Sequence, residues 1–425
     1  MKTLEQIAAA LDNYEPTALH ADAVGLFLAR WVEPLAQTEE LGILEALGRV
    51  LAQDVISPIS VPPHDNSAMD GFALDGALLR AGRPLRLRVA GTALAGRAWS
   101  GRLAGDECLK IMTGAILPAG LDTVVPVERV RLDGAYVELP ADAVRAGDNR
   151  RLLGEDLRAG QAALRQGQVL GPAALGLIAS LGLPTVRVFR RARVACFSTG
   201  DEILSLGEAP REGAVYDSNR YTLFGLLSRL GVEVVDLGAV KDEPAQLEAA
   251  FREAAARADA VITTGGVSMG EADHTRAMMK KLGDVAFWRI DMRPGRPMAV
   301  GRIVQEDRSA LLFGLPGNPV AAMVTFLAFV RPALQRLMGC TACAPVLLQA
   351  HCAEPLRKKP GRTEYQRGIV SRTAEGQLSV RTTGHQGSGV LRSMVEANGL
   401  IVLPHDRGDV AVGDTVEVMM FEGVL

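Results

Sequence analysis

The spacing of apolar and polar positions changes several times along the chain, and each change predicts a different kind of structure. LEQIAAAL near the N-terminus and the segment from Glu39 to Leu51 repeat apolar residues at helical spacing, which predicts a helical start. The short runs LRLRVAG, ECLKIM, DTVVPVE and AYVEL, separated by glycine, proline and aspartate, then predict a mainly β region over residues 54–140. Residues 141–180 are mixed and end in a helical pattern, AALGLIASLG.

From about residue 186 expected strands and helices alternate regularly. RVACFST, VEVVDLGAV, DAVITT, FWRIDM and ALLFGL are expected strands, and the last expected helix is PVAAMVTFLAFVRPALQRL. The polar residues Asp217–Asn219 offer caps for the helix YTLFGLLSRL, and Gly231 suits its end. This alternation predicts right-handed βαβ units and a mostly parallel, doubly wound sheet, whose ligands bind beyond the carboxyl ends of the strands.

After Gly339 short strand patterns return at close spacing, in VLLQAHC, TEYQRGIV, QLSVRTT, GLIVLP and TVEVMMF. They predict a small β-barrel or sandwich. The whole chain is therefore expected to be a multi-domain α/β protein with four parts. These are a discontinuous N-terminal linker domain (1–53 and 141–180), a small mainly β domain (54–140), an α/β domain (181–338) and a C-terminal β-barrel domain (339–425).

Composition excludes some classes of protein. The chain has 425 residues, 22% of them charged, and a net charge of -3, so it lacks the basic footprint of a nucleic-acid-binding protein. The N-terminus carries three acidic residues within sixteen and has no long apolar core, unlike a signal peptide. The longest strongly apolar stretch, Pro319–Val330, is too short to span a bilayer. We therefore expect a cytoplasmic protein with no membrane partner.

Five cysteines are scattered without the spacing of a disulfide framework. Cys340 and Cys343 form a CxxC that is followed by His351 and Cys352, and such a set could hold zinc. Because the second pair is adjacent rather than spaced, four ligands would converge awkwardly on one ion. An inert linker is the favoured interpretation, and the sequence leaves metal binding by this cluster open.

Two loops that follow predicted strands carry candidate chemistry. In the first, two carboxylates come directly after the strand RVACFST, at the binding edge of the sheet, although they could equally cap and solvate the next segment. In the second, TTGGVSMG, glycines let backbone N–H groups approach an anion, and the alternative is a plain turn. The residues singled out are Ser198, Thr199, Gly200, Asp201, Glu202, Gly265, Gly266, Ser268, Gly270, Glu271 and Asp273.

Two further loops complete the edge. Arg293 and Arg296 lie in the proline-stiffened RPGRP, with Arg289 upstream, and guanidinium groups suit oxyanions, although a solvated basic turn is an equal alternative. GLPGNP is a rigid turn before the last helix. Four such loops together predict a phosphate-bearing or oxyanionic ligand, with a divalent metal on Glu202, Asp242 or Asp273. The chain has neither a Walker A motif nor GxGxxG, so NTP hydrolysis and NAD binding lose support.

At these residues the chain resembles the MoeA family of molybdopterin molybdenumtransferases, which includes the E domain of gephyrin. The resemblance covers nearly the whole chain, and its segments stand in family order. They are DNSAMDGFAL (65–74), IMTGAILPAGLDTVVPVE (111–128), RRLLGEDL (150–157), FSTGDEIL (197–204), YDSNRYTL (216–223), ITTGGVSMGEADHT (262–275), RPGRPMAVG (293–301), GLPGNPVAA (314–322), GRTEYQRG (361–368) and TTGHQGSG (382–389).

The resemblance implies an elongated, four-part homodimer whose α/β domain has the molybdopterin-binding fold. The active site would lie between this domain of one subunit and the N-terminal and C-terminal parts of the other. The implied substrates are adenylylated molybdopterin and molybdate: molybdate joins the dithiolene, the pyrophosphate bond is cleaved and AMP leaves. A divalent ion, Mg²⁺ or Zn²⁺, would assist. The molybdopterin adenylyltransferase and downstream molybdoenzyme chaperones are the implied protein partners.

The resemblance also assigns roles to individual positions. The catalytic set is Asp70, Thr113, Glu202, Asp242 and Asp273, of which the last three would bind metal or position water. The binding set for substrate is Ser198, Thr199, Gly200, Gly265, Gly266, Ser268, Gly270, Arg289, Arg293, Pro316, Pro319, Arg362 and Ser388, with Arg362 and Ser388 facing the partner's site. Arginines and loop amides suit dianionic molybdate and phosphates. Asp70 has a turn-stabilising role as its alternative.

The chain departs from the family pattern at several positions. His64 replaces a usual Phe, Phe72 a common Tyr, and Arg289 and Arg293 stand where many members have Lys. Ala321 stands where many members have Ser, so a molybdate contact made by that hydroxyl would have to be made otherwise. No departure removes an acidic catalytic position.

Three other functions compete with molybdenum insertion. Adenylylation of molybdopterin, the preceding step, needs only the α/β domain, and the flanking regions argue against it. A non-catalytic scaffold is the second, because gephyrin's E domain also binds receptor tails, but the complete acidic set favours catalysis. The third is insertion of tungsten, since the two oxyanions have nearly the same size and shape.

Overall fold

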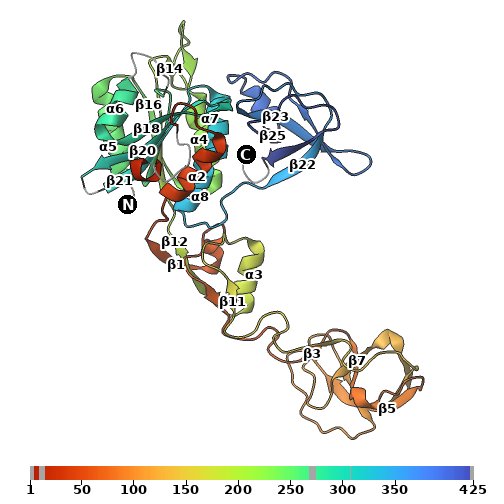
Figure 1. Cartoon of the computed structure of the whole chain (residues 1–425). Coiled ribbons are helices and arrows are strands. Elements are labelled where there is room, and N and C mark those ends of the chain that lie inside the picture. Colours follow the sequence, from red (N-terminus) through yellow and green to blue (C-terminus); the bar gives the residue numbers. More distant parts are fainter. Residues whose placement is uncertain (1–3, 9–14, 268–273, 307, 422–425) are drawn as a thin grey trace.

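The computed structural model describes residues 4–8, 15–267, 274–306 and 308–421, and it is elongated. The α/β region and the C-terminal barrel lie at one end, a linker region in the middle, and the small β region at the other end (Figure 1). This architecture confirms the expected multi-domain α/β fold. The exact boundaries between the four parts stay a prediction.

The α/β region is built on a six-stranded sheet with the order β16-β13-β17-β21-β20-β18. The first four strands run parallel, and β20 and β18 complete the sheet as an antiparallel pair. The sequence patterns did not single out β20, and β18 begins before the expected FWRIDM. The bounds are β13 (Arg193–Thr199), β16 (Glu233–Val240), β17 (Ala260–Thr264), β18 (Gly283–Arg289), β20 (Pro297–Gln305) and β21 (Arg308–Leu315).

Helices cover both faces of this sheet, as a doubly wound fold requires (Figure 1). One face packs against α2, α4, α7 and α8, and the other against α5 and α6. Asp217 caps α4 through its side chain, and Gly231 ends it in the left-handed conformation (φ 81°), as expected. The bounds are α2 (Ala21–Trp31), α4 (Ser218–Leu230), α5 (Pro244–Arg257), α6 (His274–Leu282), α7 (Pro319–Thr325) and α8 (Arg331–Leu337).

A π-helical turn, Phe326–Val330, joins α7 to α8 into one continuous apolar helix. Among the described residues this helix, Pro319–Leu337, is the single one long and apolar enough to cross a membrane. However, 72% of it is buried inside the molecule, where it packs in the largest core cluster. Burial against the sheet accounts for its apolar sequence.

The linker region corrects one expectation: residues from Glu39 to Leu51 do not form a helix. Thr38–Gly42 is strand β1, antiparallel to β12 (Thr185–Phe189), and only the 3₁₀ turn η1 (Ile43–Ala46) follows. Gly48, at φ 73°, then turns the chain back. Pairing with a distant strand has overridden the local helical spacing. The other elements of this region are β2 (Val55–Ile56), β11 (Ala162–Leu164) and α3 (Pro172–Ser180), the last as expected, whereas α1 (Leu4–Ala8) packs with α2 in the core of the α/β region.

The small β region forms one sheet with the order β7-β4-β6-β5-β9-β8 and packs a core on each face. A narrow neck, formed by β3 (Asn66–Ser67) paired with β10 (Arg150–Arg151), joins it to the linker region. The remaining bounds are β4 (Gly71–Leu74), η2 (Gly76–Leu78), β5 (Leu85–Ala93), β6 (Glu107–Ile111), β7 (Thr123–Pro126), η3 (Val127–Arg129), β8 (Arg131–Asp133) and β9 (Tyr136–Leu139).

The C-terminal region is a closed barrel with the strand order β23-β24-β22-β26-β25, which β25 closes by pairing with β23. Strand β19 (Met292–Arg293), from the α/β region, pairs with the start of β23. The bounds are β22 (Leu347–Cys352), β23 (Thr363–Arg372), β24 (Leu378–Thr382), α9 (Arg392–Glu396), β25 (Gly399–Leu403) and β26 (Thr415–Met420), and the short strands β14 (Ile203–Leu204) and β15 (Val215–Tyr216) belong to the α/β region.

Candidate active site

The register of the parallel strands brings the expected loops to one edge of the α/β sheet. Ser198 pairs with Thr264, and Thr264 pairs with Leu315 on the next strand. The loops after β13, β17 and β21 therefore start side by side. They surround a cleft of ≈ 500 Å³, and its lining includes the predicted residues Ser198, Thr199, Glu202, Gly265 and Pro319.

A network of buried polar groups forms the wall of this cleft. The Ser198 hydroxyl donates to Oδ1 of Asp217 at 2.9 Å and lies 3.0 Å from the Thr264 hydroxyl. Asp217 is 3% exposed and also accepts from the backbone N–H and Nε of Arg220. Because the side chains of Ser198, Thr264 and Asp217 are joined by these hydrogen bonds, this part of the wall is held in one arrangement.

Two asparagines connect the last loop to this wall. Asn219 Nδ2 donates to the carbonyl of Gly317 at 2.7 Å, while its buried Oδ1 has no hydrogen-bond partner in the described structure. Asn318 precedes α7 as its N-cap and lines the cleft, and its side chain accepts no capping hydrogen bond. The cleft thus keeps a buried acceptor atom available for a polar ligand.

The glycines after β17 are required by both space and conformation. A Cβ on Gly265 would lie 2.5 Å from the carbonyl oxygen of Thr199, and φ at Gly265 is 90°. A Cβ on Gly266 would meet the side chain of Thr275. Glycine therefore lets the loop pass directly over the neighbouring strand end, where Gly265 donates its N–H to the carbonyl of Leu315.

The described members of the expected acidic set, Glu202 and Asp242, lie around this loop. Glu202 lines the cleft, and a Cβ on Gly200 would lie 2.4 Å from its carboxylate oxygen, so glycine makes room for that carboxylate. Asp242 accepts a hydrogen bond from the Thr275 hydroxyl at 3.1 Å. Three expected members, Ser268, Gly270 and Asp273, lie outside the described residues. Within the described ranges no three acidic, His or Cys side chains group closely enough for a metal ion.

A second cavity, of ≈ 210 Å³, lies between the RPGRP loop and the barrel. Arg293 lines it together with Arg357 and Arg367, of which the sequence patterns had singled out only Arg293. Arg367 is 1% exposed. It donates to the carbonyl of Gly387 at 3.0 Å and to the Ser393 hydroxyl at 3.0 Å.

The charge of this second cavity is positive. Burial, with Arg293 as a lesser cause, lowers the pKa of Arg367 to about 10, so its guanidinium stays charged at neutral pH. Glu364 also lines the cavity, but its carboxylate is already bound by Arg362 and Gln366. No carboxylate of the described residues forms an ion pair with Arg367. A buried cation without a counter-ion suits a small anion.

The remaining expected binding residues are placed by strand pairing and by backbone hydrogen bonds. Arg289 pairs with Pro297 at the same edge of the sheet as the loops, where β20 begins. Pro316 follows β21 directly. The carbonyl of Ser388 accepts the N–H of Val320 on α7 of its own chain, and Gly389 lines the first cleft. The expectation that Ser388 faces a partner's site stays a prediction.

Asp70 and Thr113 meet, but far from both cavities. The hydroxyl and the backbone N–H of Thr113 donate to Oδ1 of Asp70 at 2.6 and 2.7 Å, and they hold the pKa of that carboxyl below its usual range. Both residues are exposed in the small β region. Figure 1 places that region, labelled by β3, β5 and β7, at the opposite end of the molecule from the α/β sheet.

Three family models match consecutive parts of the chain. The MoeA N-terminal region (domain I and II) matches residues 16–182, a probable molybdopterin binding domain matches 195–336, and the MoeA C-terminal region (domain IV) matches 349–421. The crystal structure of a molybdopterin biosynthesis moeA protein from Pyrococcus horikoshii OT3 is similar, with a TM-score of 0.79 and 25% identity. That match covers 95% of this chain and 100% of the other.

Relatives named molybdopterin molybdenumtransferase match along nearly the whole length. The one from Haemophilus influenzae is 42% identical over 394 residues, covering 92% of this chain and 95% of the relative. The one from Nostoc sp. is 34% identical over 387 residues, covering 90% and 88%. Identity of this extent, together with the three consecutive family matches, shows that this chain belongs to the MoeA family of molybdopterin molybdenumtransferases.

Proposed function

We propose that this protein inserts molybdate into adenylylated molybdopterin and releases AMP, the last chemical step in building the molybdenum cofactor. Its relatives carry the name of this activity. The observation that carries the proposal is the presence of two polar cavities of different character. One is a cleft beyond the carboxyl ends of parallel strands, and the other is a small cationic cavity between the RPGRP loop and the barrel.

The first cleft suits the nucleotide-bearing substrate. Backbone N–H groups of Gly266 and Val267 would favour phosphate oxygens. The buried network around Asp217 keeps Ser198 and Thr264 oriented, and Asn219 offers an acceptor for a polar substrate group. Holding the substrate in one pose lowers the entropy cost of the reaction.

The second cavity suits molybdate, a tetrahedral dianion. Arg367 is fixed by the Ser393 hydroxyl and the Gly387 carbonyl, and Arg293 approaches from the α/β region. A fixed guanidinium group with a second one beside it suits an oxyanion better than exposed lysines would. Ala321 is buried on α7 behind Gly295, so in this chain the oxyanion contacts fall to the arginines.

A divalent cation fits the acidic side of the first cleft. Glu202 lines the cleft, Asp242 is tied through Thr275 to the end of the glycine loop, and Asp273 stands in the matching family position. We assign these three residues to the cation, which is Mg²⁺ or Zn²⁺. When bound, it would neutralise charge on the pyrophosphate group.

The position of Asp70 and Thr113 leads us to propose a homodimer. The pair is exposed at the far end of its own chain (Figure 1). A catalytic role therefore requires the cleft of a second copy, and a two-fold axis would supply two such sites. We further propose that the enzyme works in the cytoplasm.

The test is AMP release from adenylylated molybdopterin by the purified protein, with and without molybdate and a divalent cation. We expect release that depends on both and that yields active cofactor. Tight binding of the substrate without release of AMP would instead indicate a scaffold, and formation of the adenylylated substrate from ATP would indicate the adenylyltransferase.

The cationic cavity has its own test within the same assay. Arg293→Ala should raise the molybdate concentration at half-maximal rate about 10- to 100-fold, the range of one charged hydrogen bond. Arg296→Ala is the matched control, because Arg296 belongs to the same loop but pairs with Asp291 at 3.6 Å instead of lining the cavity. An equal effect of the two substitutions would remove the cavity from the mechanism.

A further inference from the structure

A cysteine pair outside both cavities lies where three parts of the molecule meet. Cys340 and Cys343 form a CxxC in the turn after α8, on the way to the barrel. Between them, Thr341 donates its backbone N–H to the carbonyl of Gly167 in the linker region at 3.2 Å. Cys340 packs against Val50 of the same region. The pair therefore sits at a joint of the α/β, linker and barrel regions.

The turn holds both thiols against its own backbone. Cys343 Sγ donates to the carbonyl oxygen of Cys340 at 3.1 Å, and Cys340 Sγ donates to the carbonyl of Ala342 at 3.5 Å. These contacts keep both side chains within one short turn of the chain. Neither takes part in a metal site of three or more ligands among the described residues, because Cys352 is buried in the barrel core and His351 contacts the Gly413 carbonyl.

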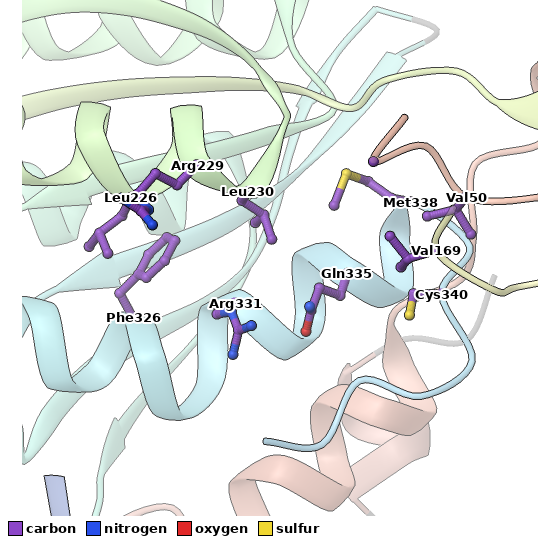
Figure 2. Close-up of a pocket in the computed structure, with 11 residues that line it drawn as sticks. Val50, Val169, Leu226, Arg229, Leu230, Phe326, Arg331, Gln335, Met338 and Cys340 are labelled. Atoms are coloured by element: carbon purple, nitrogen blue, oxygen red, sulfur yellow. The ribbon is translucent and has the colours of Figure 1, made fainter. Parts of the chain in front are cut away.

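Cys340 faces a narrow cavity of ≈ 210 Å³, which Figure 2 shows beside α8. Arg331, Gln335 and Cys340 line it in order along the helix and the turn that follows, and Arg229 lines it from α4. Gln335 Oε1 is buried and has no hydrogen-bond partner within the described part of the chain, so the cavity retains a polar atom that could bind a ligand. Cys340 itself is only 6% exposed, which restricts access to small reagents.

The electrostatics of the two thiols differ. The neighbouring Cys343, with smaller contributions from the Ala342 backbone and from Arg331, lowers the pKa of Cys340 to about 6. The neighbouring Cys340 and burial raise the pKa of Cys343. By contrast, burial raises the pKa of Cys108 and of Cys196 to about 12. The reactivity of a cysteine follows its thiolate fraction and its accessibility.

We propose that Cys340 and Cys343 are a peroxide-sensitive thiol pair that closes a reversible disulfide at this joint. The Cys340 thiolate attacks one oxygen of hydrogen peroxide, the O–O bond breaks, and a sulfenic acid and hydroxide form. Cys343 then attacks the Cys340 sulfur, its thiol proton leaves with the displaced hydroxyl as water, and the S–S bond forms. Two thiols are oxidised, and one peroxide is reduced.

Such a bond would act on the joint rather than on the cavities of the proposed reaction. It would fix the turn that leads from α8 to β22, with Thr341 still bound to the linker region. The proposal does not rest on molybdate insertion, so it survives or fails independently of that function.

The experiment treats the reduced full-length protein with one equivalent of hydrogen peroxide and measures intact mass and peptide maps. We expect the loss of two hydrogens, mapped to Cys340–Cys343 and reversed by dithiothreitol, with Cys108 and Cys196 unchanged as internal controls. In Cys343→Ser the reaction should stop at the sulfenic acid, which dimedone traps at Cys340. In Cys340→Ser neither product should form.

Two further measurements keep the test decisive. Thermal unfolding of each variant checks that it is folded. In the wild-type protein, alkylation of Cys340 by iodoacetamide should show a midpoint near pH 6, and Arg331→Gln should move that midpoint upward. A dimedone adduct at Cys352 instead, no disulfide in the wild type, or a midpoint in the ordinary range of thiols would overturn the proposal.

Discussion

The cleft of the α/β region and the Asp70–Thr113 pair are two polar sites built in opposite ways. In the cleft, Asp217 is 3% exposed and accepts hydrogen bonds from Ser198 and Arg220. At the other end of the molecule, the Asp70 carboxylate accepts hydrogen bonds from Thr113 alone among the described residues and lies open to solvent. The first site is fixed by its own chain, whereas the second presents one carboxylate on an open surface.

This difference indicates how the two sites divide the work. A buried network fixes positions and excludes water, and both effects strengthen electrostatic interactions. An exposed carboxylate gains neither until another surface covers it. We infer that the cleft binds and orients the substrate, and that the Asp70–Thr113 pair becomes effective only when a second chain covers it.

The largest expected effect comes from removing one catalytic side chain at each site in separate variants, which are then coexpressed. Asp70→Ala and Glu202→Ala should each lower the rate of AMP release by at least about 100-fold, as loss of one charged catalytic group does. When the two variants are coexpressed in equal amounts, about half of the dimers should be mixed, and each mixed dimer contains one intact site out of two. The total rate should therefore recover to about a quarter of the wild-type rate. Activity that stays at the level of the single variants would place the whole site within one chain.

Stability provides the next contrast. Asp217→Ala should destabilise the α/β region by about 2–4 kcal/mol, because it removes a buried helix cap and leaves donors of Ser198 and Arg220 unsatisfied. Asp75→Ala removes the exposed cap of η2 and should cost less than about 1 kcal/mol. Thermal unfolding of both variants checks this, and similar shifts would contradict the contrast.

The glycine loop allows a matched pair within the cleft. Gly265→Ala should cost about 1–3 kcal/mol and weaken substrate binding, because the added Cβ meets the Thr199 carbonyl at a φ of 90°. Gly317→Ala, where the nearest atom to an added Cβ is 3.8 Å away, should leave folding unchanged. Unfolding curves and substrate binding by both variants test this, and equal losses would show that crowding at Gly265 is not the cause.

The smallest effect should depend on pH and lies at the neck. The backbone N–H of Leu153, and then Arg150, hold the pKa of Asp65 below its usual range. A lowered carboxyl pKa stabilises the folded state above the ordinary aspartate pKa, and this contribution is lost as the pH falls through the lowered value. Asp65→Asn should therefore cost under about 1 kcal/mol at neutral pH. The difference in unfolding midpoint should vanish in acid, and a difference that persists there would exclude this cause.

Much of the fold could be predicted because its signals are local. The Asp217 cap and the Gly231 stop of α4 depend only on neighbouring residues, and both predictions were confirmed. The helix expected from Glu39 to Leu51 was wrong because β12, more than 140 residues away, pairs with Thr38–Gly42. Strand β20 was not predicted, because its residues follow a proline-rich loop that was interpreted as a binding loop and not as the start of a strand.

The candidate site was predictable only in part. Loops after parallel strands meet at one edge by topology alone, so Glu202, Gly265 and Pro319 could be grouped from the sequence. Arg367 could not, because its contact with the cavity depends on how the barrel packs against the RPGRP loop. Its signal was a lone arginine within the strand pattern TEYQRGIV, which becomes informative only once its 1% exposure is known.

The neck has a consequence for how such a molecule can evolve. Because β3 and β10 are antiparallel neighbours, the chain enters and leaves the small β region at the same point. That region is a self-contained insertion with its own cores, and it could be exchanged for another module without rethreading the rest of the chain. A lineage could thus remodel the surface that carries Asp70 while its α/β cleft is inherited intact.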